Sequence, residues 1–143
     1  MNEIRNVKIL FVAGFGPIVD DGKASQKLYM ESLGLHLTDE KDPGYFHTEK
    51  LDGVKHFALW PVSMVAQACF DKDSWPEDIA VPQAWIDFEV EDLEKATAEL
   101  QSQGHRLLVA GRKEPWGQIV TRLISPEGLL VAITVTPWLR KDK

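Results

Sequence analysis

Apolar and polar positions in the first part of the chain predict a strand, a helix and then three more strands. Pro17 has no backbone N–H, so we expect the first strand to be irregular or to lie at a sheet edge. Apolar positions at helical spacing follow Asp21, a good N-cap, and the helix is predicted to end at Gly34. The predicted strands cover residues 7–19, 35–38, 45–49 and 54–60.

The pattern changes between residues 62 and 83. Ser63 is placed to cap a short helix that runs to Phe70, and a polar stretch with two prolines follows. We interpret the whole segment 62–83 as a connector on the protein surface.

The first pattern then begins again. Residues 85–90 alternate with period two, which predicts a strand, and Asp92 is placed to cap a helix that ends at Gly104. The strands predicted after this helix cover residues 106–110, 118–124 and 129–136.

The two patterns form an internal repeat. Val19 and Val90 are equivalent at an offset of 71, and Gly34 and Gly104 at an offset of 70. Each half has the order βαβββ, in which the helix covers one face of the sheet and the other face needs a partner. We therefore predict an α+β fold in which two βαβββ modules form a curled, cup-like mixed sheet. The predicted single domain, residues 1–143, divides into module one at 7–61, the connector at 62–83 and module two at 84–138.

Composition and charge exclude some classes of partner. The chain has 143 residues and a net charge of −6, with no basic stripe, which argues against nucleic acid and against an anionic membrane. Cys69 is the one cysteine, so no internal disulfide can form, and its apolar neighbours predict a buried small residue rather than a nucleophile. We find no signal-peptide pattern and no long apolar run, so a cytoplasmic location is expected.

Three groups of residues together resemble the motifs of one known family. They are Leu28-Tyr29 with Leu33-Gly34-Leu35 (similar to "F-Y … L-G-L"), Ile86 to Leu93 (similar to an opening strand and helix cap), and Pro115-Trp116-Gly117 with Ser125 to Gly128 (similar to "P-W-G … D-P-x-G"). The family that they resemble is the glyoxalase/bleomycin-resistance/dioxygenase (vicinal oxygen chelate) superfamily. The resemblance covers roughly residues 14–138, and Ser125 replaces the aspartate that is usual in the family's final turn.

The resemblance implies four metal-ligand positions, one on the first strand and one on the last strand of each half. In this chain they fall near Gly14 and on Trp85, Ala58 and Ala132, and none of these side chains can bind a metal. We therefore expect a metal-less member without a cofactor, and not a glyoxalase I, extradiol dioxygenase or metal-dependent thiol transferase. Two alternatives stay open: a displaced metal site of the His56/Glu89 type, or polar residues that only line the cavity or face solvent.

The cavity of such a cup would have aromatic and acidic walls. Trp60 and Trp85 lie at or beside the implied metal positions, and Asp87 and Glu89 alternate with Trp85, a combination that favours a flat or cationic ligand. Arg122 could bind an anion, but a surface position is the stronger expectation. The candidate ligand-binding residues are Trp60, Trp85, His56, His47, Asp87, Glu89 and Trp116.

Three functions are compatible with this pattern. The first is a small-molecule binding protein that sequesters an aromatic or basic compound, as in the antibiotic-resistance branch of the superfamily. The second is an atypical lyase, isomerase or dioxygenase-like enzyme, metal-independent if a lyase or isomerase, with His56, His47 or Glu89 as general base. The third is a regulatory or structural protein with a filled cup. The resemblance further implies a homodimer, with or without exchange of modules, and leaves the ligand undefined.

Overall fold

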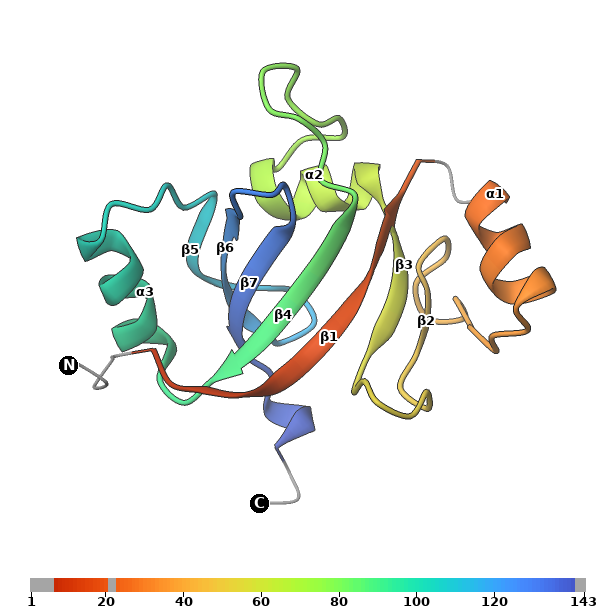
Figure 1. Ribbon diagram of the computed structural model, residues 1–143, viewed down its shortest axis with the longest axis horizontal. Coiled ribbons are helices and arrows are strands. Elements are labelled where there is room, and N and C mark those ends of the chain that lie inside the picture. Colours follow the sequence, from red (N-terminus) through yellow and green to blue (C-terminus); the bar gives the residue numbers. More distant parts are fainter. Residues whose placement is uncertain (1–6, 21–22, 141–143) are drawn as a thin grey trace.

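The computed structural model describes residues 7–20 and 23–140, and its centre is a curled, open sheet of seven strands (Figure 1). The strand order is β2-β3-β1-β4-β7-β6-β5. The strands are β1 (Ile9–Val19), β2 (Phe46–Thr48), β3 (Phe57–Pro61), β4 (Ala84–Val90), β5 (Val109–Lys113), β6 (Ile119–Ile124) and β7 (Leu130–Val135).

The two modules join through their first strands. β1 and β4 pair antiparallel, β3 lies parallel to β1, and β7 lies parallel to β4. Phe15 pairs with Ile86, and the separation of this one pair, 71 positions, equals the offset of the sequence repeat. The prediction of an α+β fold with a curled mixed sheet is confirmed.

Helices lie outside the two ends of the sheet (Figure 1). On one side a short α1 (Lys23–Gln26) continues as a π-helix, η1 (Lys27–Ser32), and on the other lies α3 (Leu93–Ser102). Asp92 caps α3 as predicted, because its side chain accepts a hydrogen bond from the Lys95 backbone N–H at 3.1 Å. The cap predicted at Asp21 lies outside the described residues.

One prediction about module one is wrong, and another is confirmed in one of its two alternatives. The strand predicted at 35–38 is reduced to one bridge between Thr38 and His47. The first strand was predicted to be irregular or to lie at an edge, and the first alternative is confirmed: β1 lies between β3 and β4 and contains two register shifts. Pro17 is tolerated there because its pairing with Ala84 is the last of the β1–β4 ladder, where a missing donor removes little.

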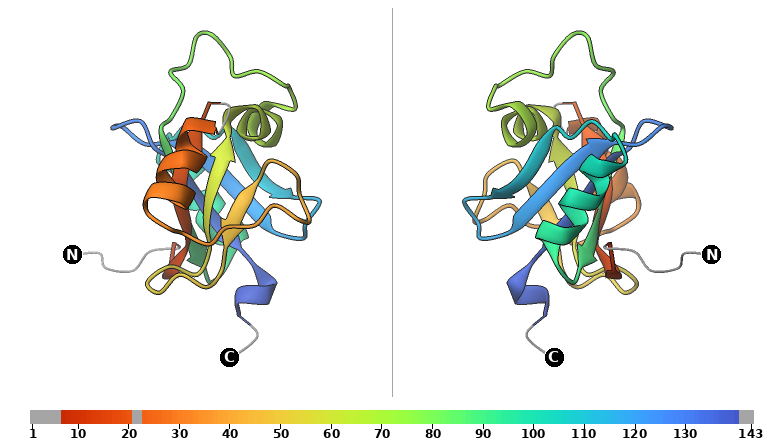
Figure 2. Two further views of the ribbon diagram at one scale, coloured as in Figure 1. Left: turned by 90° about the vertical axis from the view of Figure 1, so that its right-hand side faces the viewer. Right: turned by 90° about the vertical axis from the view of Figure 1, so that its left-hand side faces the viewer.

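The connector is not entirely on the surface, contrary to our expectation. Its helix α2 (Val62–Phe70) lies across one end of the curled sheet (Figure 2), and Val65 and Cys69 are buried in one cluster with Trp85 and Leu130. The apolar face of α2 needs burial, and the concave side of the sheet provides it. This part of the cup is therefore filled by the chain itself, and the prediction of a buried Cys69 is confirmed.

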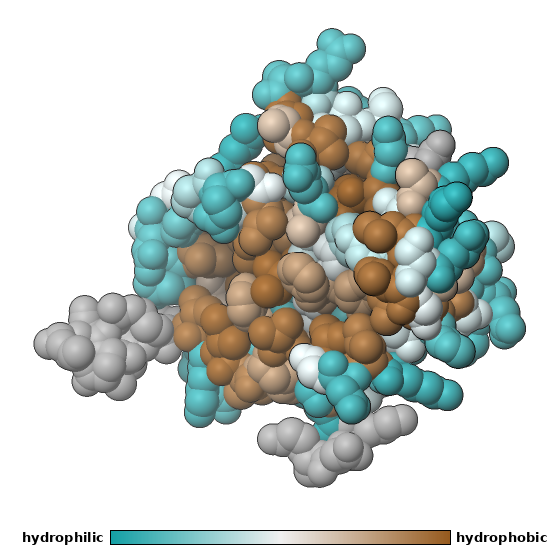
Figure 3. All heavy atoms as spheres, turned by 45° about the vertical axis from the view of Figure 1, so that its right-hand side comes forward, coloured by the Kyte–Doolittle hydropathy of each residue, from teal (hydrophilic) through white to brown (hydrophobic). Residues whose placement is uncertain are grey.

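Several large hydrophobic side chains of β1 are exposed. Ile9, Leu10, Val12 and Phe15 are exposed large hydrophobic residues on this strand. Figure 3 shows hydrophobic atoms gathered across the middle of one face of the molecule, with hydrophilic atoms around them. No helix among the described residues is long and apolar enough to cross a membrane.

Candidate functional site

The positions that the family uses for metal ligands are filled by an indole ring. Trp85 is 3% exposed, and a Cβ atom placed on Gly14 would lie only 2.7 Å from its Cζ3 atom. Trp85 Nε1 also donates a hydrogen bond to the backbone oxygen of Ala58 at 3.3 Å. Ala58 and Ala132 are buried and offer only methyl groups. The residues present here do not fit a metal ion, because no donor side chains converge and Trp85 occupies the space.

A buried arginine stands beside the tryptophans. The Arg122 guanidinium lies 5.5 Å from the Trp60 ring, whose centre is 5.8 Å from that of Trp85. Arg122 is 2% exposed and forms an ion pair with the buried Glu114, so the surface position expected for it is wrong. Its burial is possible because Glu114 neutralises the charge and the Ala68 backbone oxygen on α2 accepts a further hydrogen bond.

Glu89 is fully buried and has structural partners. It accepts hydrogen bonds from the Thr136 backbone N–H at 2.7 Å and from Arg140 Nε at 2.6 Å. Through these contacts, the segment that follows β7 is held against β4. Glu89 and His56 are thus not brought together as the pair that the sequence allowed, since the groups around His56 are Tyr45, His47, Glu49 and Trp85.

Asp87 belongs to a polar chain that runs toward the rim of the cup. Gln118 Nε2 donates hydrogen bonds to Asp87 at 3.2 Å and to Thr134 at 2.8 Å, and Gln118 Oε1 accepts one from Trp116 Nε1 at 2.8 Å. Burial raises the pKa of Asp87 to about 6, although Arg122 and the Gln118 hydrogen bond oppose the shift. Trp116 itself is 51% exposed, so it lies at the rim rather than inside.

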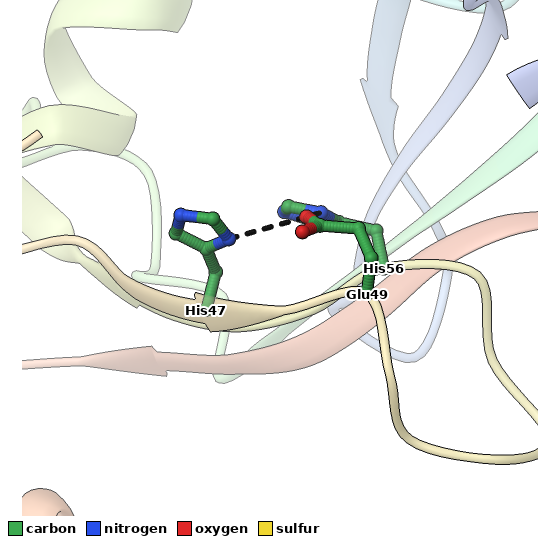
Figure 4. A group of neighbouring side chains, drawn as sticks. All are labelled: His47, Glu49 and His56. Carbon is green, nitrogen blue, oxygen red and sulfur yellow. Dashed lines mark hydrogen bonds and ion pairs between the residues drawn. The ribbon is translucent and has the colours of Figure 1, made fainter. Parts of the chain in front are cut away.

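Two histidines and a glutamate converge on the β2–β3 side of the cup (Figure 4). His47 lies on β2, Glu49 follows the end of β2, and His56 immediately precedes β3. The three are neighbours because His47 pairs with Ala58, so that alternate residues of the two strands share the concave face. His47 Nδ1 lies 3.1 Å from Glu49 Oε2, and His56 Nδ1 is hydrogen-bonded to the same oxygen.

Tyr45 extends this cluster. Its hydroxyl group lies 2.7 Å from His56 Nε2, and its ring stacks on both His47 and His56. Burial lowers the pKa of His56, against the effect of Glu49, and burial together with Asp87 raises the pKa of Tyr45. The sequence analysis named both histidines but missed Tyr45 and Glu49. The available signal was the alternation of Tyr45, His47 and Glu49, which places all three on one face.

An open groove of about 650 Å³ begins at this cluster. It lies between the β2–β3 turn, the start of β1 and the 3₁₀ turn η2 (Pro137–Leu139), and Glu49 is part of its wall. The groove could not be predicted from the sequence pattern, because it depends on how the turn and the C-terminal segment meet. The lining residues are Phe11, Val12, Glu49, Lys50, Leu51, Asp52, Gly53, Val54, Lys55, Trp138 and Leu139.

Comparison with solved structures finds the same fold. A glyoxalase/bleomycin resistance protein/dioxygenase superfamily member from Vibrio splendidus is 14% identical, with a TM-score of 0.55, and the match covers 87% of this chain and 97% of that one. Methylmalonyl-CoA epimerase from Streptomyces coelicolor is 15% identical, with a TM-score of 0.52, over 91% and 99% of the two chains.

A mutant of homoprotocatechuate 2,3-dioxygenase from Brevibacterium fuscum is 21% identical, with a TM-score of 0.59. The match covers 94% of this chain but only 34% of the dioxygenase. None of the proteins of curated function matches this chain. At these identities the similarities show the fold alone.

The family model described as Glyoxalase/Bleomycin resistance protein/Dioxygenase superfamily matches residues 14–133. This range agrees with the extent of the resemblance read from the sequence, and it includes both modules and the connector. The chain belongs to the Glyoxalase/Bleomycin resistance protein/Dioxygenase superfamily.

Proposed function

We propose that this protein binds a small organic molecule in the groove beside the His47–Glu49–His56 cluster, without a metal ion at the position that the superfamily uses. The observation that carries the proposal is the groove of about 650 Å³, a volume in the usual range for drug-sized ligands. The deep end of the cup offers less room, because Trp85 and α2 fill it. His47 and His56 contact Glu49, which lines the groove, and they remain candidate ligand residues.

The groove favours an aromatic compound that carries polar groups. Phe11, Leu51 and Trp138 provide apolar surface, while Glu49 and Lys55 provide charge of both signs. The preference for a basic ligand loses part of its support, because Glu89 pairs with Arg140 inside the fold. Sequestration of such a compound, as in drug resistance, is the role we propose.

A ligand screen on two tryptophan variants tests the proposal. Aromatic compounds of neutral, positive and negative charge are added to the protein, and the melting temperature is measured. A compound present at 100 times its Kd should stabilise the native state by about 2.7 kcal/mol. Trp138→Ala removes an exposed groove residue and should abolish the shift. Trp116→Ala removes another exposed tryptophan, which does not line the groove, and should leave the shift unchanged.

The opposite pattern would place the ligand at the rim marked by Trp116 and contradict the groove. An absence of hits across the panel would also contradict the proposal and favour a structural or regulatory protein with a filled cup.

A second candidate function rests on the chain of contacts from Glu49 through His56 to Tyr45. A carboxylate that orients an imidazole, with a phenol on the other ring nitrogen, is an arrangement suited to proton transfer. We propose acid–base catalysis on a carbon acid as the alternative. Exchange of a ligand proton for deuterium, followed by NMR, tests it: His56→Gln should stop the exchange even at ligand concentrations that saturate the variant. Exchange at the same rate in this variant would refute the alternative.

Dimer formation stays a prediction. The exposed Ile9, Val12 and Phe15 of β1 provide an apolar surface to which a second copy could bind. Light scattering on the purified protein measures the mass directly, and a monomer at all concentrations would contradict the prediction.

A further inference from the structure

We propose that His47, Glu49 and His56 form a binding site for one divalent transition-metal ion, with zinc the best match, away from the position that the superfamily uses. The site lies within module one, whereas the implied family site takes residues from both modules. The proposal is independent of the organic ligand discussed above.

The geometry of the ligand atoms supports the site. One atom from each residue can be chosen so that all three lie within 4.8 Å of one another. Figure 4 shows the three side chains directed toward a common point above β2 and β3. Zinc bonds of about 2.0–2.2 Å to imidazole nitrogen and carboxylate oxygen require somewhat closer spacing, which small rotations of these side chains can supply.

The hydrogen bonds in the cluster mark the atoms that would bind an ion. Both Nδ1 atoms approach the same Oε2 atom of Glu49, so each imidazole must present a proton to one oxygen. A divalent ion replaces these two protons and binds the two nitrogen lone pairs and the carboxylate at once. Two imidazoles and one carboxylate form a donor set that suits zinc better than magnesium or calcium, which prefer oxygen ligands.

Tyr45 provides the outer contact that such a site needs. Metal-bound histidine almost always donates its other ring N–H to an acceptor, which fixes the orientation of the ring. Here the Tyr45 hydroxyl oxygen lies 2.7 Å from His56 Nε2 and can accept this hydrogen bond. The stacked ring of Tyr45, 5.3 Å from that of His47, further restricts both imidazoles.

The site is accessible and leaves a position free. The side chains of His47, His56 and Glu49 are 19%, 23% and 46% exposed, so an ion can reach them from solvent. Three protein ligands leave the fourth position of a tetrahedral ion for water or another ligand. Glu49 also lines the groove, so the proposed site lies beside it.

Metal titration of untagged, chelator-treated protein tests the proposal. We expect one zinc ion per chain in isothermal titration, and with cobalt the absorption spectrum of a tetrahedral site. Each of His47→Gln, Glu49→Gln and His56→Gln should weaken binding on the order of 100-fold, since even loss of an outer contact costs about 10–100-fold. Tyr45→Phe, which removes only the outer contact, should weaken it about 10-fold.

His105→Gln is the matched control, because this histidine is exposed and lies outside the cluster. It should leave the affinity unchanged, and circular dichroism should show that every variant is folded. Absence of a stoichiometric ion, or affinity that survives all three cluster substitutions in folded protein, would overturn the proposal. Neither result would bear on the proposed binding of an organic molecule in the groove, since the titration contains no organic compound.

Discussion

Gly14→Ala should destabilise the protein because the indole of Trp85 occupies the space of the new methyl group. The added Cβ would lie 2.7 Å from Cζ3 and 2.8 Å from Cη2 of Trp85. Carbon atoms make favourable contacts at about 3.5–4.0 Å, so the overlap is close to 1 Å. The ring has little freedom to move, since it is 3% exposed and hydrogen-bonded to Ala58.

The expected loss of unfolding free energy is about 1–3 kcal/mol, the usual cost of overpacking a core. Glycine-to-alanine changes inside strands otherwise stabilise the folded protein by about 0.5–1 kcal/mol. A loss of stability on Gly14→Ala would therefore indicate steric overlap rather than the usual gain. Gly14 does not have a positive φ, and backbone strain therefore adds nothing.

A double-mutant cycle with Trp85→Phe isolates the contact. Phenylalanine lacks the ring atoms that approach Gly14, so Gly14→Ala should cost much less in this background. The two changes should then couple by at least about 1 kcal/mol. Urea unfolding followed by far-UV circular dichroism measures all four proteins without relying on tryptophan fluorescence. Equal costs of Gly14→Ala in both backgrounds would refute the claim that the indole fills this position.

Three further predictions concern buried groups. The pKa of Asp87 is raised to about 6 in the folded state, so ionisation of this carboxyl group destabilises the fold as the pH rises. Asp87→Asn should therefore stabilise the native protein by up to about 3 kcal/mol above pH 7, and this gain should disappear below pH 4. Thermal unfolding measured as a function of pH tests this prediction. Glu114→Gln leaves Arg122 buried without its ion-pair partner, so urea unfolding should show that the free energy of unfolding falls by about 3–5 kcal/mol. The double variant with Glu114→Gln and Arg122→Met should recover part of this loss. Cys69, whose pKa burial raises to about 11, should react with a thiol reagent much more slowly in native protein than in urea.

The repeat was readable from the sequence because its signals are local. Turn residues, helix caps and alternation depend on near neighbours, and the offset of 71 reappears in the pairing of Phe15 with Ile86. The position of α2 was not readable in the same way. Its apolar composition indicated that it must be buried, but the sequence did not show that it packs against the concave side of the sheet.

The candidate site was predicted in part. Trp85 lies on β4, whose alternation was visible in the sequence, and its ring is buried against Gly14. The ion pairs of Glu89 with Arg140 and of Arg122 with Glu114 join residues from different segments, and their roles depend on tertiary packing. The convergence of Glu49 on two histidines likewise depends on how the chain enters and leaves the β2–β3 turn.

Anomalous X-ray diffraction at the zinc edge, on crystals grown with zinc, tests most directly where this chain can hold a metal. We predict one strong peak among His47, Glu49 and His56, with the Trp85 indole in place beside Gly14. A peak between Gly14, Trp85 and Ala132 with the indole displaced, or no peak at the histidine cluster, would contradict this prediction.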